Sequence, residues 1–508
     1  MRIRPLRGTI KLATHDSRSG TAATKDRKGF ITICNDRQIK FSVPADLKCI
    51  STYVLLEQGK WFEKEIEFVY HYATPGMTVL DIGANVGVYT LPLAKLVGPT
   101  GQVIAYEPGT VNRQHLERSL ALNQCGNVVV SGAALSDCVG TGLLQIESSG
   151  ELNQLVAQHS DSKAVESVEV STLDAEFDRY NWTQVDFMKI DAEGQEAAII
   201  KGGQRFFKRY SPLIMFEVKH GLEINLGLVK AFQAMGFDTY RLLGDGSMLV
   251  PVDDADPIDA FELNFFAARP DRAKRVADSG LLARAEAQSE LSDDERSAAV
   301  AQYCAQPFAR AMDISAADLA QCPFYGALVA YSAYRFLPSL SADRRLALLQ
   351  KAYDDLQAFC QTSNSAAALS SLSRVAQDFG HCSTAREVLR HLLVTDKIEL
   401  DQPFFPPAAR FENLDTLTAD VWFVYAIKEV LELGGSHSSF FDRNVPELKW
   451  LAAQEPASEE VARRLVLAEL SGGLPIAEVE VHLARFQSTE DRRCVAWHEA
   501  VRSLMAGR

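Results

Sequence analysis

An apolar strand, a glycine-bearing turn and a helix follow one another between Val79 and Thr90 (VLDIGANVGVYT). Asp81 stands near the end of the strand, and Gly83 and Gly87 stand in the turn. In a parallel sheet, ligands bind beyond the carboxyl ends of the strands, where the chain turns into the next helix. Glycines in such a turn let a ligand approach the backbone because no Cβ stands in the way. This segment therefore predicts an α/β fold with a ligand site beside Asp81.

Strand-like and helix-like segments alternate from this turn as far as Ala268. Short apolar runs predict strands over residues 78–82, 103–106, 128–130, 187–190 and 213–218. Helical patterns predict helices to about 97, over 111–122, from about 195 and over 223–235. Two further pairs of runs, 143–146 with 168–170 and 237–242 with 261–267, predict hairpins. The alternation predicts a doubly wound, mainly parallel sheet covered by helices on both faces.

Glycine content divides the chain into two unlike parts. Residues 1–269 hold 23 of the 31 glycines, whereas the remainder is rich in Ala, Leu and Arg. We therefore expect four parts: an N-terminal β extension over 1–50, an α/β domain over 51–269, a linker helix over 270–295 and an α-helical domain over 296–508. Near the N-terminus, residues 30–33 and 39–43 predict a hairpin, and residues 51–72 predict a helix.

The helical part contains one segment with a recognisable pattern. Leu372–Leu393 resembles a tetratricopeptide-type helical hairpin, with Gly380 at the turn and Ala385 where close packing needs a small residue. Residues 327–359 form a weaker second copy, whose helices meet near Pro338. Such a domain offers a surface for a protein partner, although two imperfect copies do not establish a regular array.

Composition limits the class of protein. The formal net charge of −14 disfavours nucleic acid or an anionic membrane as the main partner. No apolar stretch reaches the ~18 residues that a membrane span needs. Nine cysteines without a CxxC pair argue against a disulfide framework or a structural zinc site. With no apolar segment of a secretory signal near the N-terminus, we expect a cytoplasmic protein.

A second carboxylate stands at the spacing expected for a nucleoside ligand. Glu107 ends the second strand in the sequence IAYEP, 24 residues after Gly83. A carboxylate at this place can accept hydrogen bonds from both hydroxyl groups of a ribose. The two features together predict a ligand that contains a nucleoside.

The turn itself separates two nucleoside cofactors. A dinucleotide site needs three glycines in the order GxGxxG, whereas this turn reads GxxxG, with Asn85 in the middle and no third glycine. The Asp81 carboxylate would repel a pyrophosphate and favour a cation. S-adenosylmethionine carries a sulfonium and an ammonium and no phosphate. The acidic turn therefore favours S-adenosylmethionine over NAD.

In combination, DIGANVGVYT, YEP, GAALSD and KIDAEGQE resemble the FkbM family of class I S-adenosylmethionine-dependent methyltransferases. The resemblance runs from about Ser51 to Ala268. It implies a Rossmann-like methyltransferase fold with a seven-stranded sheet, S-adenosyl-L-methionine as cofactor, and O-methylation of a sugar, glycolipid or polyketide-like acceptor. It does not extend to the helical part and implies nothing about that part's role.

The same resemblance assigns residues to the site. The methionine part of the cofactor would lie against the first strand and turn, at Asp81, Gly83, Asn85 and Gly87. The ribose would lie at Glu107, and the adenine would lie at Ala133, Ala134 and Ser136. The reaction centre would lie where the fourth strand ends, at Asp191 and Glu193, and Asp191 would also contact the cofactor.

The chemistry of methyl transfer adds candidate catalytic groups. An alcohol is a weak nucleophile until a base takes its proton, and a positioned base contributes typically 10²–10⁴-fold. Asp191 and Glu193 are the nearest candidates, although Glu193 could instead cap the following helix. His220 follows the fifth strand and is a candidate base or acceptor-binding group. Lys189 is expected to pair with a carboxylate.

Two further features bear on the acceptor end. Asp191, Glu193 and Glu217 could together hold a divalent cation, but no spacing demands it, and we expect no metal. The insertion over 143–170 is expected to lie over the carboxyl edge of the sheet, with Asn153 and His159 as candidate contacts. Three readings stay open: O-methylation, N-methylation of a protein or small molecule, and a helical scaffold with a non-catalytic cofactor fold.

Overall fold

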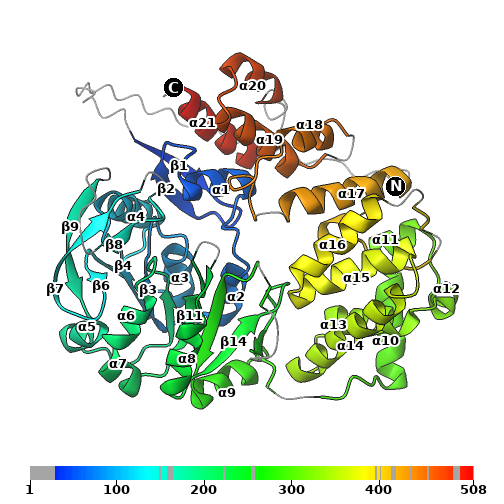
Figure 1. The fold of residues 1–508 in the computed structure, drawn as a ribbon, viewed down its shortest axis with the longest axis horizontal. Helices are drawn as coiled ribbons and strands as arrows, with labels where there is room; N and C mark the ends of the chain where they lie inside the picture. Colours follow the sequence, from blue (N-terminus) through cyan, green and yellow to red (C-terminus); the bar gives the residue numbers. More distant parts are fainter. Residues whose placement is uncertain are drawn as a thin grey trace, which may run out of the picture.

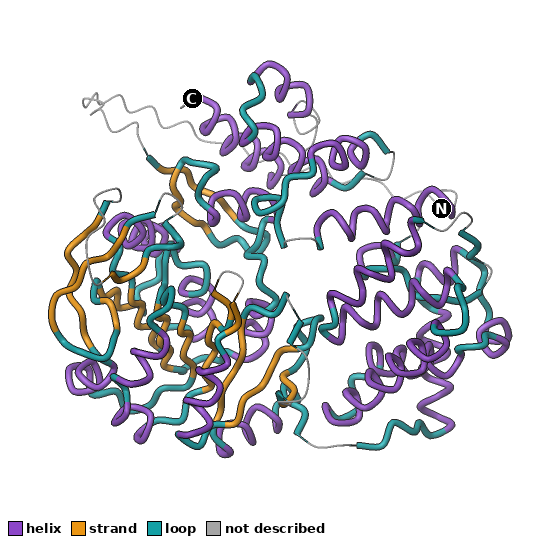
Figure 2. Tube along the Cα trace, viewed as in Figure 1, coloured by secondary structure: helices purple, strands orange, loops and turns teal. Residues whose placement is uncertain are grey.

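The structure is a computed structural model of the 508-residue chain. It describes residues 29–147, 150–156, 164–220, 223–252, 258–259, 261–284, 287–394, 398–400, 402–413, 419–434, 437–454, 457–483 and 492–506. Figure 1 shows a sheet-containing N-terminal part beside an all-helical C-terminal part, and Figure 2 shows that the described strands all belong to the first part. Among the described helices, none has the length and hydropathy needed to cross a bilayer.

The main sheet has eight strands in the order β15-β14-β16-β11-β10-β3-β4-β5. The strands β3, β4, β5, β10 and β11 are parallel, whereas β14, β15 and β16 run antiparallel to their neighbours. The bounds are β3 Thr78–Ile82, β4 Gln102–Tyr106, β5 Val128–Ser131, β10 Phe187–Ile190, β11 Leu213–Glu217, β14 Asp238–Leu242, β15 Leu249–Pro251 and β16 Asn264–Ala268. The predicted mainly parallel Rossmann-like sheet is confirmed, with β15 as an additional edge strand that the sequence did not predict.

The order of the strands fixes where a ligand can bind. From β3 the chain builds outward through β4 and β5 on one side, and through β10 and β11 on the other. The direction of winding therefore reverses between β3 and β10, where Asp81 lies opposite Lys189 in register. Open α/β sheets form their binding crevice beyond the strand ends at such a point.

Helices cover both faces of this sheet. Alternate residues of each strand face opposite sides, so Val79 belongs to one hydrophobic cluster and Leu80 to the other. The flanking helices are α3 Thr90–Val97, α4 Thr110–Asn123, α5 Leu173–Tyr180, α6 Glu196–Lys201, α7 Gln204–Arg209, α8 Leu226–Ala234 and α9 Pro270–Asp278. The predicted two-faced burial explains why the central strands are continuously apolar.

The N-terminal extension differs from expectation in one respect. The strands β1 Phe30–Cys34 and β2 Lys40–Pro44 pair as the predicted hairpin. The single helix predicted over 51–72 is instead two helices, α1 Ile50–Gln58 and α2 Glu65–Tyr72. Gly59 adopts a left-handed φ of 68° and donates its N–H to the Leu55 carbonyl, which ends α1.

The insertion after β5 forms a small sheet of its own. Its strands are β6 Ala134–Leu135, β7 Gly140–Gln145, β8 Gln154–Val156 and β9 Val165–Ser171, in the order β6-β9-β7-β8. The antiparallel pairing of β7 with β9 confirms the predicted hairpin, and β8 adds a third strand to it. A separate two-stranded ribbon, β12 Lys219–His220 with β13 Glu223–Ile224, follows β11.

The described residues after α9 are helical. The elements are α10 Asp293–Cys304, α11 Pro307–Ala311, α12 Ala316–Gln321, α13 Tyr325–Phe336, α14 Ala342–Cys360, α15 Ala366–Phe379, α16 Cys382–Leu393, η1 Ala409–Phe411, α17 Ala419–Leu433, α18 Val445–Ala452, α19 Glu459–Ser471, α20 Ile476–Leu483 and α21 Arg492–Ala506. The predicted hairpin turn is confirmed, since α15 ends at Gly380 with a φ of 105°. Its resemblance to a tetratricopeptide repeat stays a prediction. The linker helix predicted over 270–295 ends at Asp278, two residues before Gly280.

The last helices pack against the N-terminal extension. Val466 and Leu467 of α19 and Trp497 of α21 belong to the same hydrophobic cluster as Leu55 of α1. The Trp497 indole also donates a hydrogen bond of 2.7 Å to the Leu56 carbonyl. Figure 1 shows α19 and α21 lying against β1, β2 and α1. The two parts of the chain are therefore joined by a shared core.

Candidate functional site

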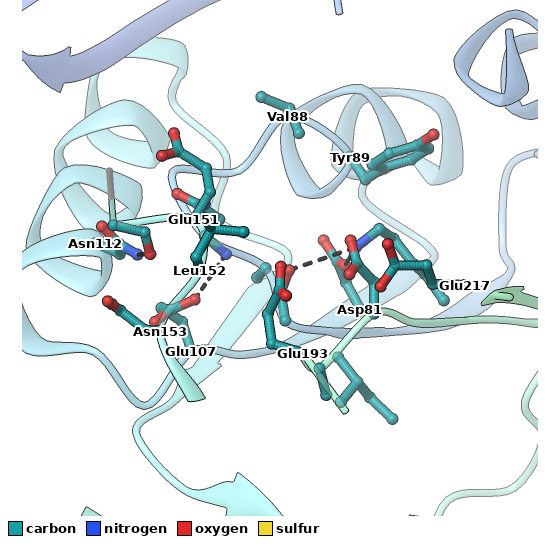
Figure 3. A pocket seen from close by; sticks show the side chains of 18 of the residues that line it. Asp81, Val88, Tyr89, Glu107, Asn112, Glu151, Leu152, Asn153, Glu193 and Glu217 are labelled. Atoms are coloured by element: carbon teal, nitrogen blue, oxygen red, sulfur yellow. Dashed lines mark hydrogen bonds and ion pairs between the residues drawn. The ribbon is translucent and has the colours of Figure 1, made fainter. Parts of the chain in front are cut away.

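A cavity of about 660 Å³ opens where the central parallel strands end. Residues after β3, β4, β10 and β11 form its floor, and the insertion residues Glu151, Leu152 and Asn153 form one wall. Figure 3 shows the side chains of Asp81, Glu107, Glu193 and Glu217 facing this space. The cavity therefore lies at the switch point of the sheet, where a ligand was expected.

Asp81 is the most buried carboxyl group of the cavity, with no exposed surface. Its Oδ2 accepts a hydrogen bond of 2.5 Å from the Thr90 hydroxyl. Its Oδ1 lies 4.0 Å from Lys189 Nζ and has no hydrogen-bond partner among the described residues. Burial raises the pKa of Asp81, and the Lys189 charge opposes that rise. One carboxylate oxygen is thus left for a ligand.

Glu107 is held by two backbone groups. The Asn85 N–H donates to Oε2 and the Gly109 N–H donates to Oε1, each at 2.8 Å. Asn85 reaches this position with a left-handed φ of 49°. Burial raises the pKa of Glu107 to about 7, although both backbone hydrogen bonds act to lower it. Each oxygen keeps a second lone pair, so the carboxylate can still accept ribose hydroxyls as predicted.

The two glycines of the turn are required by packing. Gly83 has a φ of 80°, and a Cβ there would lie 1.7 Å from the Asp191 carbonyl oxygen. Gly87 has a φ of 97°, and a Cβ there would lie 2.7 Å from Leu116 Cδ1. Gly83 lines the cavity, whereas Gly87 is not among its lining residues. Gly83 therefore lets the turns after β3 and β10 touch, which brings Asp191 beside the first turn.

Lys189, which is buried in β10, forms an ion pair with Asp191, whose side chain is 30% exposed. Lys189 Nζ lies 2.8 Å from Asp191 Oδ2 and also donates to the Gly83 carbonyl at 3.4 Å. Burial by itself lowers the pKa of Lys189, but Asp191 and Asp81 raise it above its ordinary value. Lys189 thus stays charged and partners a carboxylate, as predicted.

Glu193 and Glu217 face the same end of the cavity as Asp191. Burial, followed by repulsion from Asp191, raises the pKa of Glu193 to about 8 and that of Glu217 to about 10. Glu196, the first residue of α6, accepts the N–H groups of Ala192 and Gly194 through its side chain. The left-handed φ of 48° at Glu193 places that residue on the turn after β10. This end of the cavity therefore carries excess acidic groups.

The other predicted residues fall in different places. Ala133, Ala134 and Asn153 line the cavity, whereas Ser136 donates its hydroxyl to Gln195 Oε1 at 3.1 Å and does not line it. His220 lies in β12, but its side chain is not described, and His159 lies outside the described residues. Among the described residues, no group of three His, Cys, Asp or Glu side chains is arranged to hold a metal ion.

Several lining residues were not predicted. Trp61, Phe62 and Glu63 come from the break between α1 and α2. A second group, Phe261, Leu263 and Asn264, leads into β16, and a third, His437 and Phe441, comes from the helical part. The aromatic pair Trp61 and Phe62, which follows Gly59 and Lys60, was a possible sequence signal, because side chains at a helix break can turn toward a cavity. Nothing near His437 in the sequence indicates a site.

Residues 81–239 match the family model described as the methyltransferase FkbM domain. The chain contains a methyltransferase FkbM domain. The match begins at Asp81 and includes Glu107, Asp191 and Glu217. The cofactor of this domain is S-adenosyl-L-methionine, as expected from the sequence.

Solved structures with similarity to the chain are also methyltransferases by name. A methyltransferase FkbM from Methylobacillus flagellatus is 14% identical, with 39% of this chain and 47% of that chain covered and a TM-score of 0.27. A SAM-dependent O-methyltransferase from Thermotoga maritima is 14% identical, with 47% and 78% covered and a TM-score of 0.25. TYW2 from M. jannaschii, in complex with AdoMet, is 15% identical, with 49% and 88% covered and a TM-score of 0.26. The chain spans about half the length of the first of these proteins, and the fold assignment rests on the strand order described above.

The residues of the methyltransferase domain fit this cofactor. The unpartnered Oδ1 of Asp81 is a buried acceptor that an ammonium or a sulfonium would neutralise. The Glu107 carboxylate is held in a fixed position by two backbone N–H groups and would present its two oxygens to a ribose. Among the described lining residues, Lys189 is the only Lys or Arg, so a pyrophosphate would find little compensation. The charge of the cavity suits a cationic nucleoside.

Proposed function

We propose that the protein transfers a methyl group from S-adenosyl-L-methionine to a hydroxyl oxygen of a sugar, glycolipid or polyketide-like acceptor. The observation that carries the proposal is the group of carboxyls beyond β10 and β11. Asp191, Glu193 and Glu217 line the same cavity as Asp81 and Glu107, to which we assign the cofactor. One cavity can therefore hold the methyl donor next to side chains that can accept a proton.

The cofactor, when bound, supplies a methyl group on a sulfonium, which is already a good electrophile. The protein must therefore chiefly orient the acceptor and take its proton. Asp191 is fixed by its ion pair with Lys189, so its free oxygen is suited to orient the acceptor hydroxyl. Glu193 has a pKa of about 8 in the protein alone, and a nearby cation would lower that pKa toward neutrality. Glu193 is then poised to accept the proton at a carboxylate oxygen.

The remaining sequence candidate for a base is His220. It follows β11 on the rim of the sheet that bears Glu217. We keep it as a third candidate beside Asp191 and Glu193, to be ranked by substitution.

The charge of the cavity favours an oxygen nucleophile over a nitrogen nucleophile. An amine attacks only in its neutral form, and neighbouring carboxylates raise an amine's pKa and keep it protonated. An alcohol is uncharged, and the same carboxylates help to remove its proton. The excess of acidic groups over Lys189 therefore supports O-methylation.

A direct test separates an enzyme from a scaffold that has lost cofactor binding. Calorimetry with S-adenosylhomocysteine should show binding to the full chain and a loss of binding in the double variant Asp81→Ala, Glu107→Ala. Each charge-assisted hydrogen bond contributes roughly 1.5–3 kcal/mol, so the double variant should bind at least about 100-fold more weakly. Asp278→Ala, which removes an exposed carboxylate, is the matched control. Unchanged affinity in a folded double variant would refute the assignment.

The acceptor can be identified by comparing methylated glycans and metabolites in cells with and without the protein. A methyl ether appearing only with the active protein supports the proposal. A methylated amine would show that nitrogen is the nucleophile instead. Because the helical part shares a core with α1, the comparison should use the full chain.

A further inference from the structure

The helical part contributes directly to the cavity of the methyltransferase domain. Between α17 and α18, the segment 437–441 brings His437 and Phe441 to the cavity lining. These two residues lie 198 and 202 positions after residue 239, where the family match ends. The segment therefore adds something that the methyltransferase domain alone does not have.

A buried carboxylate fixes this segment on α1. Glu57 has no exposed surface, and its Oε1 accepts the Ser439 N–H at 2.9 Å and also the Ser439 hydroxyl. Its Oε2 accepts the Ser438 hydroxyl at 2.5 Å. The Gln58 amide donates to the His437 carbonyl at 2.7 Å. Three consecutive residues of the segment are thus held by the last turn of α1.

The backbone of the segment is strained at the residue that lines the cavity. His437 has a φ of +65°, a left-handed backbone conformation that residues other than glycine rarely adopt. Such a conformation persists only where the surroundings determine it, and here the contacts of Gln58 and Glu57 do so. The hydrogen bonds with Gln58 and Glu57 thus hold the backbone that presents the His437 ring.

Aromatic rings from three parts of the chain meet at this wall. Phe62 lies 5.7 Å from His437 and 6.1 Å from Phe441, measured between ring centroids. Phe261 lies 5.7 Å from His437. Phe441 lines the cavity and is 51% exposed, so much of its ring surface is free to contact a ligand. The rings are tilted or edge-to-face to one another, with interplanar angles of 35° to 76°, so together they line the wall with apolar ring faces and edges.

A hydrogen-bond donor without a partner lies in the same cavity. Asn264 is 3% exposed, and its Nδ2 has no hydrogen-bond partner among the described residues. It lies opposite Glu217 in the register of β16 with β11. A buried polar group left without a partner is costly, which points to a ligand atom that accepts from it.

We propose that Asn264, the rings of Phe62 and Phe261, and the segment 437–441 form the acceptor subsite. The acceptor is an uncharged hydroxyl compound with an apolar part, which packs against the rings while one of its oxygens accepts a hydrogen bond from Asn264. An anionic acceptor is disfavoured, because the charge of Lys189 is already paired with Asp191 and lies 4.0 Å from Asp81 Oδ1. The inference rests on the function proposed above and makes the helical part a component of the active site.

A matched pair of probes tests the subsite without knowledge of the natural acceptor. Benzyl alcohol and benzoate share a flat ring and differ in charge. With the full chain saturated with S-adenosylhomocysteine, saturation-transfer NMR should detect binding of benzyl alcohol and little or no binding of benzoate. Equal binding of the two probes, or no binding of benzyl alcohol, would overturn the proposal.

Two variants test whether benzyl alcohol binds in the proposed subsite. Asn264→Ala and Phe441→Ala should each weaken benzyl alcohol binding, by about 2- to 10-fold for loss of a single neutral hydrogen bond in the first case. Phe441 is half exposed, so its variant should fold even if Asn264→Ala does not. Phe30→Ala, which removes an exposed ring outside the cavity, should leave probe binding unchanged.

The cofactor titration separates the two proposals. If both variants keep the affinity for S-adenosylhomocysteine and lose the probe, the subsite is supported. If S-adenosylhomocysteine binds but the variants bind benzyl alcohol as the wild type does, the subsite is wrong and the proposed function stands. If S-adenosylhomocysteine does not bind to the wild-type chain, the proposed function fails, and the subsite proposal fails with it.

Discussion

The affinity of the protein for its cofactor should depend on the ionisation of Glu107. Burial raises the pKa of this carboxyl to about 7, so in the free protein it is largely protonated below neutrality. The ribose hydroxyls are held by the carboxylate, because only that form offers both oxygens as acceptors. Binding below pH 7 must therefore release the proton, and affinity should fall as the pH falls.

The size of the effect follows from the pKa. A carboxyl with a pKa of about 7 is roughly 75% ionised at pH 7.5 and roughly 3% ionised at pH 5.5. If binding requires the ionised form, the dissociation constant should rise about 25-fold between these pH values, or about 2 kcal/mol. A carboxyl with its ordinary pKa would change affinity by much less over the same range.

Calorimetry with S-adenosylhomocysteine over this pH range is the assay, and Glu107→Gln is the comparison. The glutamine cannot ionise, so the dissociation constant of the variant should lack the 25-fold rise between pH 7.5 and pH 5.5 that Glu107 causes. Any pH dependence from other groups should be the same in both proteins. Its overall affinity should be lower, because its amide NH2 must face one of the N–H groups of Asn85 and Gly109. Parallel pH profiles in the two proteins would refute the reasoning.

The same pKa predicts a change in stability. Because the folded-state pKa of Glu107 lies above its unfolded value, protonation of Glu107 favours the folded state, and this contribution is complete below about pH 4.5. It is lost as the pH rises to about 7, a difference on the order of 3 kcal/mol. The stability of Glu107→Gln relative to the wild type should therefore increase with pH across this window, as measured by urea unfolding of the protein without cofactor.

Three further substitutions test separate parts of the structure. Asp191→Asn should keep the affinity for S-adenosylhomocysteine while lowering the methylated product in cells by up to about 100-fold, the cost of a misplaced acceptor; an unchanged amount of product would show that Asp191 does not orient the acceptor. Gly83→Ala should destabilise the fold by about 3 kcal/mol or more, since its Cβ would strike a carbonyl oxygen, whereas Gly126→Ala has open space and should leave the melting temperature nearly unchanged. Glu57→Ala should cost about 1–3 kcal/mol by leaving buried donors unpaired, and a melting temperature equal to that of the wild type would show that the segment 437–441 is held by other contacts.

The cofactor end of the site was predictable because its residues are set by local rules. A carboxylate at a strand end and a glycine-bearing turn specify where Asp81 and Gly83 lie, once the strand is recognised. The spacing to Glu107 follows from one helix and one strand between two neighbouring positions in a parallel sheet. What local pattern did not show was the reason for Gly83, whose neighbour is the Asp191 carbonyl, 108 residues away.

The fold was also predictable from local patterns, and the errors of that prediction lie at single local features. The sheet and the helical C-terminal part follow from alternation and from glycine content. The helix predicted over 51–72 fails because an apolar periodicity continues across Gly59, while the backbone there leaves the helix. The edge strand β15 was missed because three residues, Leu249–Pro251, carry no periodicity that can be recognised.

The acceptor end could not be predicted because it depends on one long-range interaction. Glu57 and Ser438 are 381 residues apart, and neither belongs to a sequence pattern that predicts a contact between them. A glutamate near the end of a helix is normally solvated, yet here it is buried by serines that satisfy its oxygens. Because that carboxylate positions His437 and Phe441, the shape of the acceptor subsite depends on how two distant parts of the chain pack. A methyltransferase domain of this sequence placed on a different helical partner would therefore keep its cofactor site and change its choice of acceptor.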